Sequence, residues 1–174
     1  MVCRKVSATL QRDQACALAK RDSRKALEKA LDIRDPWFRS QALAWVARFT
    51  KDDPIKIAMR AAKAGSECDD DYKKTAVCAW EIAALAERKL FTEARKRLRM
   101  ALSQSRGVTP LSSRAEALTL LLQAAFLIAD EDAKVVADEL RNSCGHDSHW
   151  RCKRAIRDAG KLAEGQLEPR RFFS

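Results

Sequence analysis

The sequence predicts an all-α protein that folds as a right-handed α–α superhelix of about four helical hairpins plus a C-terminal helix. The composition is typical of helices, with only five Gly and four Pro among 174 residues. No stretch alternates apolar β-branched or aromatic residues with polar ones, as a strand would. The segment 35–49, DPWFRSQALAWVARF, is echoed by the segment 70–84, DDYKKTAVCAWEIAA. A repeat of about this length is typical of stacked helical hairpins.

Acidic residues mark the expected starts of several helices. Asp35-Pro36 and Asp53-Pro54 are the clearest, because an Asp side chain can accept the first free backbone N–H groups and Pro fits the first helical turn. The fourth pair is expected to start near Pro110, or at Ser113, which stands at capping-box spacing from Glu116. The nine expected helices cover roughly residues 6–19, 23–31, 36–49, 54–65, 71–88, 92–104, 110–129, 130–144 and 148–164.

Three glycines follow the second helix of a pair. Gly65, Gly107 and Gly145 each precede a new helix-start signal by a few residues. We expect each of them to adopt the left-handed conformation that commonly ends a helix. The expected domain therefore spans residues 1–164, and the tail 165–174 has no helical pattern.

Two tryptophans occupy equivalent positions in the repeated segment. Trp45 and Trp80 coincide when the two copies are superposed. They can pack between neighbouring hairpins, or they can line a concave groove and bind a ligand there. Glu81 replaces Val46 of the preceding copy, so a carboxylate interrupts the apolar stripe. This residue is expected either at the edge of the core or in the groove.

Basic residues cluster on two expected helices. Arg95, Arg97 and Arg99 form one run, and Arg151 and Arg154 belong to the other. Both runs are expected on the outer face, where they could bind a nucleic-acid backbone. Aromatic residues interleaved with the charges would strengthen that interpretation, and none lies within either run.

Some of these charges have a carboxylate at helical spacing, which predicts local ion pairs. The expected pairs are Glu93 with Lys96 and Arg97, Asp147 with Arg151, and Asp158 with Arg154. The net charge of +10 nevertheless favours an acidic partner, whether a protein segment or a nucleic acid.

Both histidines of the chain lie in the segment 144–152, CGHDSHWRC. Cys144, His146, His149 and Cys152 are of the types that bind zinc. Four ligands so close in sequence are difficult to arrange as a tetrahedron, so no metal is expected and these residues are only weak candidates. The six cysteines are expected as reduced thiols, because this chain has enough apolar residues to form a core without disulfides.

The segment 91–102, FTEARKRLRMAL, resembles the second helix of a tetratricopeptide-like repeat. Ala94, Leu98 and Ala101 match the small, large and small positions of that helix. The similarity extends over residues 22–160 in period and in small/large alternation, although the Gly usual in the family's first helix has no counterpart. HEAT-like repeats, whose period is longer, remain an alternative. The resemblance implies a superhelical scaffold whose concave groove binds a peptide segment or another protein.

The sequence therefore predicts a non-enzymatic protein–protein interaction scaffold, which binds an acidic segment in its groove or on a basic flank. Nucleic-acid binding through the basic helices is the alternative, and a HEAT-like enzyme acting on DNA through Trp80 and Glu81 is a third hypothesis. No phosphate-binding loop, catalytic triad or metalloprotease motif is present, so no cofactor is expected. No export signal and no apolar run of about 20 residues are present, so a cytoplasmic location without a membrane span is expected.

Overall fold

The computed structural model describes residues 6–173, and within them the only regular secondary structure is α-helix. This confirms the all-α class. The ten helical segments are α1 (Ala8–Ala19), α2 (Ser23–Leu31), α3 (Pro36–Phe49), α4 (Pro54–Ser66), α5 (Asp71–Ala76), α6 (Cys78–Glu87), α7 (Phe91–Ser105), α8 (Leu111–Ala125), α9 (Asp130–Cys144) and α10 (Trp150–Ala163).

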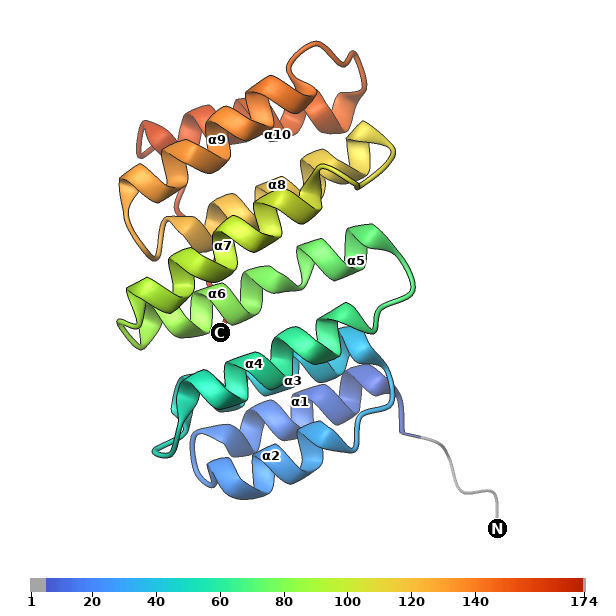
Figure 1. The fold of residues 1–174 in the computed structure, drawn as a ribbon, viewed down its shortest axis with the longest axis vertical. Helices are drawn as coiled ribbons and strands as arrows, with labels where there is room; N and C mark the ends of the chain where they lie inside the picture. The colour runs from blue at the N-terminus through green and yellow to red at the C-terminus, as the bar shows by residue number, and fades with distance from the viewer. Residues whose placement is uncertain (1–5, 174) are drawn as a thin grey trace.

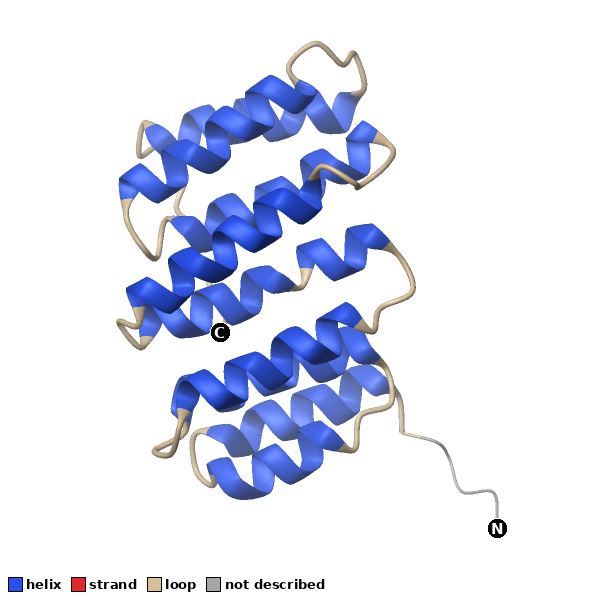
Figure 2. Ribbon diagram, in the orientation of Figure 1, coloured by secondary structure: helices blue, strands red, loops and turns tan. Residues whose placement is uncertain are grey.

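The helices lie in two layers (Figures 1 and 2). One layer, in front in Figure 1, contains α2, α4, α7 and α9; the other, behind it, contains α1, α3, α5, α6, α8 and α10. In the back layer α1, α3, α6, α8 and α10 pack on one another in that order, whereas helices of the front layer contact one another only sparsely. The right-handed superhelical path stays a prediction.

One expected helix is divided in two. Val77 is both the last cap of α5 and the first cap of α6, so the helix expected from residue 71 onward has a short break there. The break lies beside Gly65 of α4: a Cβ atom on Gly65 would lie 2.7 Å from Cγ1 of Val77. A glycine at this position therefore allows α4 and the α5–α6 junction to approach closely.

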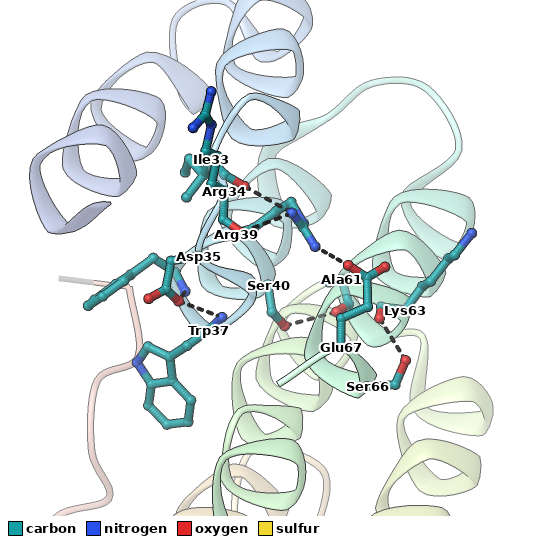
Figure 3. Close-up of polar contacts among 11 residues, drawn as sticks. Ile33, Arg34, Asp35, Trp37, Arg39, Ser40, Ala61, Lys63, Ser66 and Glu67 are labelled. Atoms are coloured by element: carbon teal, nitrogen blue, oxygen red, sulfur yellow. Dashed lines mark hydrogen bonds and ion pairs between the residues drawn. The ribbon is translucent and has the colours of Figure 1, made fainter. Parts of the chain in front are cut away.

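The aspartate caps are confirmed. Asp35 Oδ1 accepts a hydrogen bond from Trp37 N at 2.9 Å (Figure 3), and Asp70 Oδ1 accepts one from Lys73 N at 2.7 Å. Asp35 and Asp70 are equivalent in the repeated segment, and each begins a back-layer helix. The rings of Trp37 and Tyr72, also equivalent, stack on each other with centroids 6.5 Å apart.

Polar contacts join α3 to the segments on either side (Figure 3). Ser40 Oγ donates to the buried carbonyl of Ala61 in α4 at 2.9 Å. Arg39 donates to the carbonyl of Ile33 at 3.0 Å and forms an ion pair with Glu67. The bond to Ile33 satisfies a backbone carbonyl just after the end of α2, and the bond to Ala61 links α3 to the middle of α4.

The prediction of left-handed glycine caps was wrong. Gly65 lies inside α4, and Gly145 has a right-handed φ of −64°. Among the described residues only Lys89 and Gly165 have positive φ, at 59° and 68°. Left-handed residues instead follow α6, at Lys89, and α10, at Gly165. Gly65 is explained by close packing rather than by its backbone conformation.

Two helix starts differ slightly from expectation. Helix α8 begins at Leu111, and Pro110 precedes it without a side-chain cap, so Ser113 and Glu116 do not form a capping box at its start. Helix α10 begins at Trp150, and His149 is its cap.

The core lies between the layers and consists largely of small residues. Alanines at nearly every turn are fully buried, which lets the helices approach closely. The largest fully buried apolar side chains of the C-terminal half are Leu118, Leu121, Leu122 and Leu140.

Candidate functional site

The C-terminal tail folds back over the back layer. Arg170 N donates to Gln123 Oε1 of α8 at 2.7 Å. The Phe172 ring meets Trp80 of α6 edge-to-face, with centroids 5.4 Å apart, and the Phe173 ring meets Trp45 of α3 in the same way, also at 5.4 Å. The two phenylalanines are only 5% and 9% exposed. We call the surface formed by Trp45, Trp80 and Gln123 the tail site.

Arginine side chains cover the rings of the tail site. The Arg170 guanidinium lies 5.2 Å from the centroid of Trp80, and the Arg48 guanidinium lies 4.9 Å from that of Phe173. Arg48 is also ion-paired with Glu87. A cation on an aromatic face contributes about 0.5–1 kcal/mol where water reaches it.

A cavity of about 380 Å³ lies beside the docked tail. Arg12 of α1 is held there by Gln41 Oε1, at 3.0 Å from its Nη1, and by Asp13, at 2.6 Å from its Nη2. Arg170 and Arg171 reach the same cavity from the tail. Its size falls in the range of ligand sites, and its charged lining is three arginines and one aspartate.

Trp45 and Trp80 are brought to one surface, as the groove interpretation requires, but they differ in burial. Trp80 is 7% exposed and also meets Trp37 edge-to-face at 5.7 Å. Trp45 is partly exposed and lies 6.0 Å from the Phe49 ring. Both border the cavity. Trp80 therefore contributes to both the core and the site, and Trp45 mainly to the site.

Glu81 lies in the core and does not line the cavity. Its carboxylate is 1% exposed and forms an ion pair with Arg97 Nε at 2.8 Å. The alignment is poor, so neither carboxylate oxygen nor Nε has a hydrogen-bond partner. Burial raises the pKa of Glu81 from 4.5 to about 7, an effect that Arg97 only partly offsets.

Several arginines of the basic runs pair with carboxylates of other helices, and among the described residues none of the local pairs predicted from helical spacing is formed. Arg95 pairs with Asp132 of α9 at 2.9 Å. Arg151 and Arg154 share Glu116 of α8, at 3.4 and 3.2 Å. Arg99 is exposed and has no ion pair among the described residues. Because Arg97 faces Glu81, this run is not wholly on the outer face.

An exposed aromatic residue at the second run was missed. Trp150 is 57% exposed, and the guanidinium groups of Arg151 and Arg154 lie 5.4 and 5.0 Å from its ring centroid. The His149 ring stacks on it at 6.0 Å. The sequence HWR contained this signal, because the tryptophan directly precedes the run. We call Trp150, His149, Arg151 and Arg154 the α10 patch.

The cysteine and histidine residues are divided between the core and the surface. Cys144 and Cys152 are fully buried and their thiols contact each other; burial raises the pKa of Cys144 to about 11. His149 Nδ1 instead accepts a hydrogen bond from Arg151 N at 3.2 Å, and His146 lies at the surface. Within residues 6–173 no three His, Cys, Asp or Glu side chains are grouped as metal ligands. Cys3 lies outside the described residues.

Comparisons with protein-family models, curated protein sequences and solved structures gave no match. No helix in the described part of the chain combines the length and the apolar character that crossing a bilayer requires.

Proposed function

We propose that this protein is a non-enzymatic interaction scaffold of the tetratricopeptide-like kind, which binds a segment of another protein across its back layer. The observation that carries the proposal is that this surface already accommodates a non-helical chain segment. Residues 170–173 contact α8, α6 and α3 in turn, through Gln123, Trp80 and Trp45. A cytoplasmic location is part of the same proposal.

The charge of the cavity supports an acidic partner. Its charged side chains are Arg12, Arg170, Arg171 and a single carboxylate, Asp13. Arg12 belongs to α1 and borders the cavity whether or not the tail is docked, whereas Arg170 and Arg171 reach the cavity only with the docked tail. With a net charge of +10 on the chain, an acidic segment is attracted before contact and retained at the cavity.

The experiment is affinity capture with the full-length protein, followed by mass spectrometry and by mapping of the captured segment. Arg12→Ala is expected to lower capture several-fold, because Arg12 is the cavity arginine that does not depend on the docked tail. Arg24→Ala, on the exposed face of α2 away from the cavity, is the matched control and is expected to leave capture unchanged. Equal capture by both variants, or a captured segment without acidic residues, would contradict the proposal.

The α10 patch favours a second candidate, single-stranded nucleic-acid binding. An exposed tryptophan flanked by arginines can stack on bases while the guanidinium groups contact phosphates. Binding to a single-stranded oligonucleotide is expected to fall steeply as salt rises. Trp150→Ala is expected to weaken binding about tenfold, since base–aromatic stacking contributes about 1–3 kcal/mol. Fluorescence anisotropy with Phe91→Ala as the control measures this, and affinity unchanged by Trp150→Ala excludes stacking at the patch.

A further inference from the structure

We propose that the tail site recognises a segment with two adjacent aromatic residues, and that the protein's own residues 170–173 are a built-in competitor for such a segment. The inference rests on the proposed function, because it assigns the partner class for that same surface. The occupant to which we commit is a non-helical segment of another protein.

The tail site has two separate positions for aromatic rings, so a segment needs two aromatic residues to fill it. Trp80 receives the ring of Phe172 at an interplanar angle of 81°, and Trp45 receives that of Phe173 at 86°. Edge-to-face pairs of this kind contribute about 0.5–1.5 kcal/mol each beyond the burial of their area. Because the two tryptophans come from neighbouring helices, a segment with a single aromatic residue fills only one position.

Little besides these rings holds the tail. Between residues 168 and 173, the only hydrogen bond to the rest of the described chain is that from Arg170 N to Gln123. Residues 164–171 are exposed, and neither Arg170 nor Arg171 forms an ion pair with a described residue. A segment with few buried contacts opens at low free-energy cost. The tail can therefore leave its site while the helices remain folded.

Tethering makes the tail an effective competitor. A covalently linked ligand acts at an effective concentration in the millimolar range. The apparent affinity of an external segment falls in proportion to the fraction of molecules in which the site is open. An aromatic pair on a partner must therefore bind more tightly than the tail, or arrive with additional contacts such as acidic residues opposite Arg12.

The test uses a fluorescent peptide of the tail sequence EPRRFFS and full-length protein, measured by anisotropy. The double variant Phe172→Ser/Phe173→Ser empties the site and is expected to bind the peptide at least about tenfold more tightly than the unmodified protein. Leu167→Ser, in the exposed part of the tail, is expected to behave like the unmodified protein. A peptide with serine at both phenylalanine positions is expected not to bind.

Several outcomes overturn the inference. A folded double variant that does not bind the peptide shows that the tail only completes the structure, and equal binding by both proteins places the peptide elsewhere. If the double variant does not fold, Arg170→Asp, which removes the cation over Trp80, must raise peptide affinity instead. A dimer of the unmodified protein that the phenylalanine changes dissociate would make a second copy the occupant.

Different experimental results contradict the proposed function and the recognition of an aromatic pair. Peptide binding that follows expectation while no acidic partner is captured contradicts the proposed function alone. Arg12-dependent capture of a partner, without any effect of the phenylalanines on capture or on peptide binding, contradicts the inference alone.

Discussion

Arg97→Ala is expected to lower the free energy of unfolding by about 1.4 kcal/mol more at pH 8 than at pH 5, because without its cation the buried Glu81 must take up a proton at pH 8. Glu81 is 1% exposed, and its only ion pair is with Arg97 Nε at 2.8 Å. Urea unfolding followed by circular dichroism measures the change. Arg99→Ala, two residues further along α7 at an exposed position without an ion pair, is expected to change stability by less than about 0.5 kcal/mol.

The pH dependence of the stability loss shows whether Arg97 acts through the charge of Glu81. The pKa of Glu81 is about 7 in the folded protein and near 4.5 when unfolded, so the folded state binds more protons between these values. The free energy of unfolding therefore contains a contribution that falls as pH rises from 4.5 to 7. At pH 5 Glu81 is already protonated in the folded state, so the charge-dependent part of the Arg97→Ala loss, about 1.4 kcal/mol at pH 8, is expected to be absent.

Removing both charges is expected to restore the stability that Arg97→Ala loses. Glu81→Leu combined with Arg97→Met removes both charges and is expected to restore stability to near that of the unmodified protein, or above it. An equal loss for Arg97→Ala at pH 5 and pH 8, or no recovery in the double variant, would show that the arginine acts through packing and not through charge.

Trp80→Ala is expected to lower the free energy of unfolding by about 3–5 kcal/mol, the range for large-to-small changes at buried aromatic residues. Its indole contacts both Trp37 and Phe172 and is 7% exposed. Trp45→Ala is expected to cost less, because that side chain remains partly exposed with the tail docked. Urea unfolding of both variants at pH 7 compares them.

Comparing the two tryptophan variants distinguishes a residue that stabilises the fold from one that binds the tail. Trp45→Ala is expected to abolish binding of the tail peptide to the variant with an empty site while leaving the fold intact. Equal destabilisation by the two tryptophan changes would indicate that both act mainly as packing between hairpins.

The sequence was informative wherever the structure depends on neighbours in the chain. Asp35 and Asp70 cap their helices as the repeated segment predicts, since a capping bond spans only two or three residues. The paired helices follow from apolar spacing of three and four residues, which reports which face is buried. The pairing of Trp45 with Trp80 on one surface also follows from their equivalent positions.

Contacts between distant elements could not be predicted in this way. Arg95 pairs with Asp132 and Arg154 with Glu116, because the sequence does not specify which side chains on neighbouring helices face each other. Position 65 requires a glycine because Val77 packs against it, and not because a turn needs a left-handed residue there. Phe172 and Phe173 lie in a segment without helical pattern, and nothing local indicates that they are buried.

The docked tail also affects how the helices unfold. In a stack in which each helix pair contacts only its neighbours, the two ends can lose structure independently. Here the segment that follows α10 contacts α3, and so connects the last helix to the second pair. Its docking is therefore expected to couple the unfolding of the two ends, and its release is expected to let the two ends unfold independently.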